Sequence, residues 1–145
     1  MIRLVALDRY NWEAVAALKV AEEQEKFIPP NVFSIAQARF EPSELYGVYD
    51  GDRPVGFLMI CVWAKIHWIT RIMTAADEQG KGYGARALEE AVKLLKRRPD
   101  CYEIRASVHH KNVRALHLFE SAGFVFMGDS DPLELFFHLV VRTHK

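Results

Sequence analysis

Apolar residues alternate with polar ones, or run together, in short segments along most of the chain. Strands of a partly buried sheet have this period of two, whereas helices repeat their apolar positions every three or four residues. Seven such segments are predicted as strands: residues 2–7, 44–49, 55–63, 66–74, 102–108, 124–128 and 133–141. The turn-rich stretch DGDRP separates the second segment from the third, so these two are expected to form an antiparallel hairpin.

Helical spacing of apolar residues begins soon after the first predicted strand. The first predicted helix follows Asp8, which can act as its cap, and repeats apolar residues from Trp12 to Leu18. Residues 34–37 have the form of a capping box, so a second, short helix is expected to begin at Ser34.

Two longer helices are predicted in the second half of the chain. The first follows the glycines of residues 79–84 and repeats apolar residues from Ala85 to Leu95, with a proline shortly after it. The second is capped by Asn112 and ends at Gly123, because glycine suits the left-handed conformation common after a helix.

The predicted order is therefore strand, two helices, three strands, helix, strand, helix and two strands. Consecutive strands dominate the middle, so the pattern indicates an α+β fold with a mixed sheet rather than a doubly wound fold. The chain has 145 residues, the length of one domain, and we expect a single domain over residues 1–145.

Composition and charge narrow the class of partner. The 19 basic residues balance 19 acidic ones, so we expect neither nucleic acid nor membrane as a partner. The longest apolar run, VGFLMICVWA, is too short to span a bilayer, and the first residues, MIRLVALDRYNW, lack the form of a signal peptide. Cys61 and Cys101 are expected to be buried thiols, and together these features predict a cytoplasmic protein.

The stretch QGKGYG, residues 79–84, places three glycines directly before a predicted helix. Tyr83 breaks the G-x-x-x-x-G-K-[ST] form of a triphosphate-binding loop. Gly80, Gly82 and Ala85 match the letters of a dinucleotide fingerprint, but that motif belongs directly after the first strand of a βαβ unit. A glycine turn without a ligand is the plain alternative. Bare N–H groups at the start of a helix nevertheless make a ready anion site.

The loop and a second segment resemble motifs of the GNAT superfamily of N-acetyltransferases. Residues 79–84 resemble its Q/R-x-x-G-x-G/A motif, and NVRALHLFESAGF, residues 112–124, resembles its N-x-x-A-x-x-L-Y-e-x-x-G-F segment at matching distance. The order of elements agrees across the whole chain. The resemblance implies a GNAT fold, with a mixed, mostly antiparallel sheet of about seven strands flanked by helices.

This resemblance also implies acetyl-CoA as the co-substrate. In the family, the loop amides hold the pyrophosphate, pantetheine pairs with the strand upstream, and an amide near Met73 faces the carbonyl oxygen. The implied cofactor-binding residues are Ile72, Met73, Thr74, Gln79, Gly80, Lys81, Gly82, Tyr83, Gly84, Asn112 and Phe119. Lys81 either adds charge beside the pyrophosphate or is an exposed loop residue, whereas Asn112 can both cap its helix and contact coenzyme A.

A narrower resemblance concerns the acceptor. Residues 20–38, 71–84 and 128–139 are similar to segments of bacterial polyamine and diamine N-acetyltransferases. This implies acetyl transfer by direct attack of a primary amine of spermidine, spermine or a diamine. The residues expected to bind the acceptor are Glu22, Gln24, Phe27 and Glu134. Acetylation of an amino acid or of a protein amine is the alternative within the same chemistry.

One position departs from the family pattern and leaves the catalytic residues unassigned. Most members carry a tyrosine that reprotonates the leaving thiolate where this chain has Phe119, and phenylalanine has no proton to donate. An alkylammonium must also lose its proton before attack, at a cost of roughly 4 kcal/mol at neutral pH. Glu134, which interrupts an apolar strand, and His109 are the candidates for proton transfer. A regulatory module that binds coenzyme A, with weak or lost catalysis, is the competing hypothesis.

Three further expectations complete the sequence-based picture. No spacing of histidine, cysteine and carboxylate residues suggests a metal site, so no metal is expected. Trp63 and Trp68 could line an acceptor pocket, but packing in the core is the expectation. The sequence leaves the oligomeric state open, and a homodimer is compatible with it.

Overall fold

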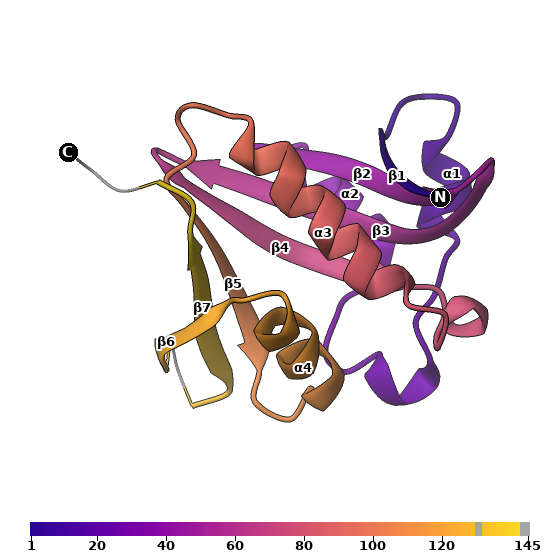
Figure 1. The fold of residues 1–145 in the computed structure, drawn as a ribbon. Helices are drawn as coiled ribbons and strands as arrows, with labels where there is room; N and C mark the ends of the chain where they lie inside the picture. The colour runs from indigo at the N-terminus through magenta and orange to yellow at the C-terminus, as the bar shows by residue number, and fades with distance from the viewer. Residues whose placement is uncertain (130–131, 143–145) are drawn as a thin grey trace.

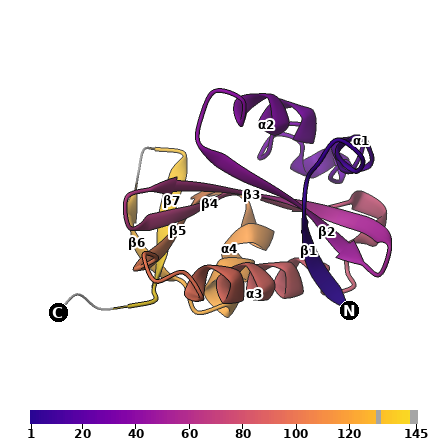
Figure 2. The ribbon, with the colours of Figure 1, turned by 90° about the horizontal axis from the view of Figure 1, so that it is seen from above.

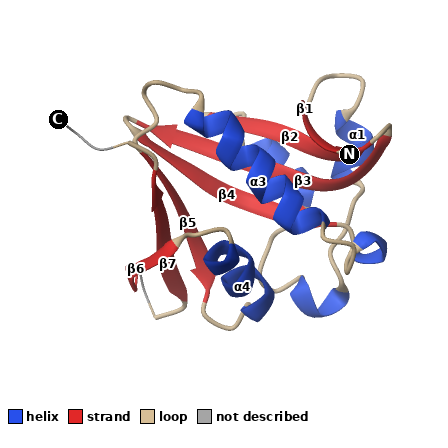
Figure 3. Ribbon diagram, viewed as in Figure 1, coloured by secondary structure: helices blue, strands red, loops and turns tan. Residues whose placement is uncertain are grey.

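The structure is a computed structural model that describes residues 1–129 and 132–142. Its order of helices and strands is the one expected from the sequence, with two short 3-10 helices added (Figures 1 and 3). The strands are β1 (Ile2–Ala6), β2 (Ser43–Asp50), β3 (Arg53–Trp63), β4 (Ile66–Thr74), β5 (Glu103–His109), β6 (Val125–Asp129) and β7 (Glu134–Val140). The helices are α1 (Trp12–Ala16), α2 (Asn31–Gln37), α3 (Tyr83–Lys96) and α4 (Val113–Ser121), and the 3-10 helices are η1 (Glu22–Gln24) and η2 (Ala76–Glu78). Within the described ranges, no helix is long and apolar enough to cross a membrane.

The strands of the described residues form one sheet in the order β1-β2-β3-β4-β5-β7-β6. Neighbouring strands are antiparallel except β4 and β5, which run parallel. These two pair only from Ile66 with Glu103 to Ile69 with Ala106, and Figure 1 shows that they separate beyond that point. The backbone of residues 71–74 therefore has a strand partner on the β3 side only.

A one-residue bulge in β4 decides which way its later side chains point. Ile69 and Arg71 pair with adjacent residues of β3, so Thr70 between them has no partner there. Ile69 and Ile72 consequently pack in the same part of the core although they are three positions apart. Arg71 lies on the opposite face, where its side chain reaches a glutamine of α2.

Helices cover both faces of the sheet, with α3 and α4 on one face and α1 and α2 on the other (Figure 2). The larger core, which includes Leu88 and Ile104, lies beneath α3 and α4. A smaller core with Phe57 and Met59 lies beneath α1 and α2. Burying each such side chain fully stabilises the fold by roughly 1.5–3 kcal/mol. Both cysteines are free and buried, as the sequence predicted.

The second helix does not begin where the capping pattern placed it. The predicted start at Ser34 is wrong, because α2 begins at Asn31, directly after Pro30, and Ser34 is buried inside the helix. The side-chain amide of Asn31 donates hydrogen bonds to the backbone oxygens of Val15 (3.0 Å) and Leu18 (3.3 Å). This contact with the end of α1 fixes the start of α2, and no local capping pattern contains it.

The first helix is shorter than predicted. It ends at Ala16, so Leu18 lies outside it. The expected cap is also wrong: Oδ1 of Asp8 accepts hydrogen bonds from the N–H groups of Tyr10 (2.8 Å) and Asn11 (3.0 Å), before the helix begins. The aspartate thus closes a turn of its own rather than the first turn of α1.

Three local turn and cap signals are confirmed. The β2–β3 hairpin turns through Gly51, which has a φ of +63°. Oδ1 of Asn112 accepts a hydrogen bond from the N–H of Ala115 at 3.3 Å, and Gly123 after α4 has a φ of +92°. Each signal depends on only a few adjacent residues, which is why the sequence could show it.

Candidate active site

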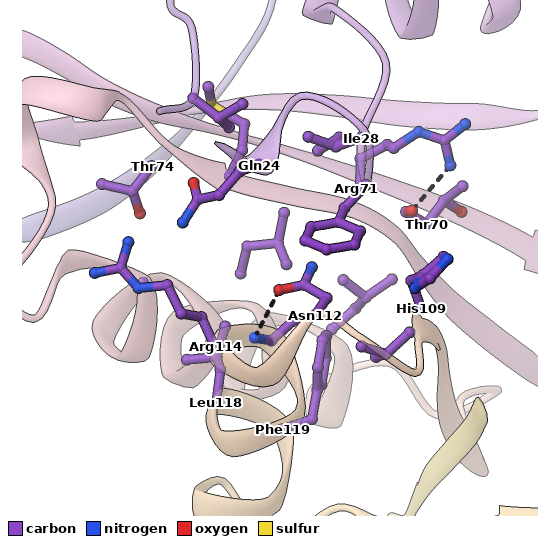
Figure 4. Close-up of a pocket in the computed structure, with 18 of the residues that line it drawn as sticks. Gln24, Ile28, Thr70, Arg71, Thr74, His109, Asn112, Arg114, Leu118 and Phe119 are labelled. Atoms are coloured by element: carbon purple, nitrogen blue, oxygen red, sulfur yellow. Dashed lines mark hydrogen bonds between the residues drawn. The ribbon is translucent and has the colours of Figure 1, made fainter. Parts of the chain in front are cut away.

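A cavity of about 740 Å³ lies where β4 and β5 separate. It is lined from both faces of the sheet, and Figure 4 shows side chains of the two faces around it. One part, here called the loop half, is lined by Thr74 and by members of residues 79–84 and 112–119. The other, the Glu134 half, is lined by members of residues 24–29 and by Thr70, Arg71, His109 and Glu134.

The glycine loop gives the loop half its bare backbone. Gly80 and Gly82 both have a φ of +82°, a conformation that side chains other than glycine rarely adopt, although there is open space around both. Gly82 is the residue before α3, and its carbonyl accepts the first helical hydrogen bond, from Arg86. The N–H groups of residues 83–85 have no acceptor among the described residues. They form the kind of helix start that binds a phosphate group.

Gln79 ties this loop to three other segments. Its Nε2 donates hydrogen bonds to the carbonyl of Thr74 (3.1 Å) and to Oε1 of Gln24 (2.8 Å). Its Oε1 accepts a hydrogen bond from Nη1 of Arg114 on α4. The bond to Gln24 links the loop half directly to the Glu134 half. Arg114 could not be singled out from the sequence, because nothing in its position within the motif indicates which loop it reaches.

The charged side chains beside the loop are paired with each other. Nζ of Lys81 lies 2.8 Å from Oε1 of the buried Glu78, whose carboxylate also pairs with Arg53. The hydroxyl of Tyr83 donates to Oδ2 of Asp50 at 2.6 Å, and this bond holds the pKa of Asp50 below its usual value. Lys81 is not among the residues that line the cavity, so its ammonium points to Glu78 rather than to the open space.

Phe119 lies at the inner end of the loop half. It is buried on α4 and packs edge-on against Phe124, with the ring centres 5.2 Å apart. Asn112, at the start of the same helix, also lines the cavity while it caps α4 (Figure 4). At this place in the cavity wall the chain therefore has a phenyl ring, which carries no hydroxyl group.

His109 stands between Phe27 and the next histidine in the Glu134 half. Its ring centre lies 5.1 Å from that of Phe27 and 4.8 Å from that of His110. Nδ1 of His109 accepts a hydrogen bond from the N–H of Lys111 at 3.1 Å, so in neutral His109 the proton is on Nε2. In this arrangement Nε2 is the ring nitrogen that can donate a hydrogen bond to a bound molecule.

Glu134 begins β7 directly opposite His109 in the β5–β7 register. Its half-buried side chain lines the cavity, and its negative charge acts on Arg71. Burial lowers the pKa of Arg71, and the charge of Glu134 opposes that shift. The Glu134 half therefore contains a carboxylate and a guanidinium from two strands that are not neighbours in the sheet.

Aromatic side chains continue this half of the cavity. Trp68 packs edge-on between Trp63, at 6.4 Å between ring centres, and Phe136, at 5.4 Å. Both tryptophans line the cavity, and Trp63 is 55% exposed. Core packing was therefore the wrong expectation for Trp63, which is the last residue of β3 and is exposed.

One of the remaining candidates, Glu22, lies apart from the cavity. Glu22 is exposed and is not among the residues that line the cavity, whereas Gln24 and Phe27 of the same segment do line it. In the part of the chain that the structure describes, no cluster of three or more histidine, cysteine or acidic residues could hold a metal ion.

Comparison with known proteins identifies the family. The Acetyltransferase (GNAT) family matches residues 9–124, which include the glycine loop and α4. The chain belongs to this family, and it is an acetyltransferase of the GNAT type that uses acetyl-CoA.

Relatives and solved structures agree with this assignment. The chain is 28% identical to Spermine/spermidine N(1)-acetyltransferase of Bacillus subtilis (strain 168) over 142 residues, which cover 90% of this chain and 91% of the relative. It is 17% identical to the structure of spermidine N-acetyltransferase from Vibrio cholerae in complex with CoA and spermine, with a TM-score of 0.77 and coverage of 96% and 95%. A Bacillus subtilis acetyltransferase in complex with CoA gives a TM-score of 0.75 at 17% identity, with coverage of 97% and 99%. These structures establish the GNAT fold of the sheet and helices described above.

Proposed function

We propose that this protein transfers the acetyl group of acetyl-CoA to a primary amine of a small polyamine or diamine by direct attack. The observation that carries the proposal is one cavity that joins the bare glycine loop to the carboxylate of Glu134, through the gap between β4 and β5. Relatives named for spermine and spermidine support the choice of acceptor.

The loop half has the groups that a coenzyme A molecule requires. The N–H groups of residues 83–85 can receive its pyrophosphate. The backbone of residues 71–74 lacks a strand partner on the β5 side, so it can pair with the amides of pantetheine as an added strand does. In this proposal a backbone N–H near Met73 stabilises the negative charge that develops on the acetyl oxygen, because it is already oriented before the reaction.

In this proposal the side chains of the Glu134 half bind the amine and accept its proton. Acetyl-CoA supplies an activated thioester, and the amine nitrogen forms the new C–N bond as the C–S bond breaks. Glu134 takes the proton of the amine, directly or through a water molecule, and His109 donates a hydrogen bond from Nε2. Phe119 has no proton to give, so the thiolate leaves unprotonated and takes its proton from water, which is feasible because a thiol has a pKa of about 8.5.

The test is release of the coenzyme A thiol with spermidine, spermine and putrescine as acceptors, with the acetylated products identified by mass. We expect turnover with at least one of these amines and none without an amine. Tight binding of acetyl-CoA without turnover of any amine would overturn the proposal.

Phe119 favours a second candidate function, a module that binds coenzyme A for regulation with weak catalysis. The variant Phe119→Tyr restores the hydroxyl that most family members have at this position. A large increase in kcat would show that the native enzyme lacks an efficient proton donor, and it would support the regulatory candidate. An unchanged kcat would show that the native reaction does not use that hydroxyl group.

A further inference from the structure

Two tryptophans give the Glu134 half an aromatic surface that the proposed transfer to a polyamine does not use. Trp63 and Trp68 both line the cavity, and 55% of Trp63 is exposed. Their ring planes meet at 74°, with 6.4 Å between the ring centres. We call this pair the tryptophan corner. A flat apolar group can stack on one of its rings and meet the other edge-on, which is a favourable arrangement for aromatic rings.

The order of side chains on β7 connects Glu134 to the tryptophan corner. Glu134 and Phe136 are two positions apart on this strand, so their side chains lie on the same face, with Cα atoms roughly 7 Å apart. The ring of Phe136 packs edge-on against Trp68, with 5.4 Å between the ring centres. A molecule whose amine lies at Glu134 can therefore reach the tryptophan corner through a short carbon chain.

The charges beside the tryptophan corner do not favour a second ammonium group. Trp68 and Arg71 pair with alternate residues of β3, so their side chains lie on the same face of the sheet. The guanidinium of Arg105 lies over the ring of Trp68, 5.8 Å from its centre, where a ligand cation would otherwise bind. Glu103 accepts a hydrogen bond from Nε of Arg105 at 3.0 Å and holds this guanidinium in place. Among the described residues that line this half, Glu134 is the only carboxylate.

This combination of groups suits an acceptor with one amine and an uncharged ring. A second ammonium group at the tryptophan corner would be repelled by Arg71, and the protein itself already places a cation at Trp68. An aromatic ring has no charge to be repelled, and its burial beside two indoles contributes favourable binding free energy. Apolar and aromatic side chains that line a cavity beside a few polar groups are typical of a binding site for a small molecule.

We propose that the protein also acetylates arylalkyl monoamines, whose aromatic ring binds at Trp63 and Trp68 while the amine lies at Glu134. The inference rests on the proposed acetyl transfer and extends it to a second class of acceptor. The chemistry is the same: the amine nitrogen forms the new C–N bond, the C–S bond breaks, the thiolate leaves and Glu134 takes the proton of the amine. The two classes differ in the part of the acceptor that does not react.

Matched amines test this inference in the unaltered enzyme. Ethylamine and 2-phenylethylamine differ only in the ring, and 2-cyclohexylethylamine has a ring of similar size that is neither flat nor aromatic. We expect kcat/KM from thiol release to be roughly 10- to 100-fold higher for 2-phenylethylamine than for ethylamine, with 2-cyclohexylethylamine in between. Equal values for 2-phenylethylamine and ethylamine would overturn the inference. The proposed function would still stand if spermidine, spermine or putrescine is acetylated.

A variant of Trp63 tests whether the tryptophan corner binds the ring. In Trp63→Ala we expect kcat/KM for 2-phenylethylamine to fall by roughly 5- to 30-fold, mainly through KM, with a much smaller change for ethylamine. Trp12→Ala is the matched control, because Trp12 is a partly exposed tryptophan of α1 that does not line the cavity. An equal loss for both amines would overturn the inference, since it would assign Trp63 a structural role. An undiminished preference for 2-phenylethylamine would overturn it as well.

A folding defect can be separated from a binding defect. Affinity for acetyl-CoA, which depends on the loop half, is expected to be the same in Trp63→Ala and the unaltered protein. If Trp63→Ala does not bind acetyl-CoA, Trp63→Leu decides, because it keeps an apolar side chain and removes the aromatic ring. We then expect a reduced preference for 2-phenylethylamine over ethylamine, and a preference equal to that of the unaltered protein would contradict the inference.

Failure of the proposed function can be distinguished from failure of this inference. Turnover of none of these amines, nor of spermidine, spermine or putrescine, would overturn the proposed function. Calorimetry with the protein saturated with coenzyme A then tests the tryptophan corner by itself. We expect 2-phenylethylamine to bind at least tenfold more tightly than ethylamine, and to lose this advantage in Trp63→Ala. Equal affinities for the two amines would overturn the inference.

Discussion

The two halves of the cavity are built from different kinds of groups. The loop half offers backbone N–H groups at the start of α3, held open by Gly80 and Gly82. The Glu134 half offers side chains from segments that lie far apart in the sequence, among them Phe27, Arg71 and Glu134. Backbone groups recognise a phosphate that is the same in every donor molecule, whereas side chains can be exchanged to suit a particular acceptor. In the proposed function, a donor site made of backbone groups and an acceptor site made of side chains therefore share one cavity.

Among the substitutions that distinguish the two halves, a change of Glu134 is expected to have the largest effect on catalysis. If the Glu134 half supplies the proton acceptor, Glu134→Gln should lower kcat by roughly 10²- to 10⁴-fold and leave the Kd of acetyl-CoA unchanged. Glu120→Gln is the matched control, because Glu120 is exposed on α4 and does not line the cavity. Steady-state kinetics and acetyl-CoA titration measure the two quantities. A kcat within a fewfold of the unaltered enzyme would remove Glu134 as the base.

The loop half can be impaired separately through its backbone. Gly82→Ala forces a side chain into a left-handed conformation, at a cost of roughly 1–2 kcal/mol, and should weaken acetyl-CoA binding by about 5- to 30-fold. Gly51→Ala introduces similar strain in the β2–β3 turn, away from the cavity. It should lower the free energy of unfolding without changing the Kd of acetyl-CoA. If both variants weaken binding equally, the effect reflects general stability rather than the loop.

One hydrogen bond joins the two halves, and its removal tests how independent they are. Gln24→Ala should weaken acetyl-CoA binding by a fewfold, because Gln24 accepts a hydrogen bond from Gln79 of the loop. A double-mutant cycle with Gln79→Ala should give a coupling free energy of roughly 0.5–1 kcal/mol. The control is Glu23→Ala, at an exposed neighbour. Additive effects of the two substitutions would show that the halves bind their ligands without this link.

The smallest expected effect concerns the shared core rather than either half. Burial, followed by the charge of Arg98, lowers the pKa of the buried His67, against the smaller opposing effects of Asp100 and Glu44. The unfolded chain then binds a proton at His67 more readily than the folded protein does. The free energy of unfolding should therefore fall as the pH drops below about 6.5. Above that pH His67 is neutral in both states and contributes no pH dependence.

Urea unfolding at pH 7.5 and pH 5.5 measures this effect. The loss of unfolding free energy between the two pH values should be smaller in His67→Leu than in the unaltered protein. Acidic residues such as Glu44, whose pKa is lowered by Arg98, add their own losses only at lower pH. An equal loss in both proteins would mean that His67 does not titrate in this range. The acetyl-CoA affinity of His67→Leu at pH 7.5 should match that of the unaltered protein.

The sequence by itself determined the features that depend on neighbouring residues. The order of strands and helices, the hairpin at Gly51, the cap at Asn112 and the glycine loop all follow from short-range patterns, and the motifs around two of them were enough to indicate the family. Glu134 could be singled out because it interrupts an apolar strand, and both candidates for proton transfer, Glu134 and His109, line the cavity.

Only the tertiary structure decided how distant segments meet. The bulge at Thr70 places Arg71 in the cavity, and Gln79 joins Gln24 to Arg114 across three segments. The physical reason is the same in each case. Strand register and the packing of one segment on another choose which side chains converge, and an isolated stretch of sequence carries no information about its partners. The proposed donor site and Glu134 could therefore be inferred from the chain alone, whereas the charge of Arg71 in the Glu134 half became visible only in the fold.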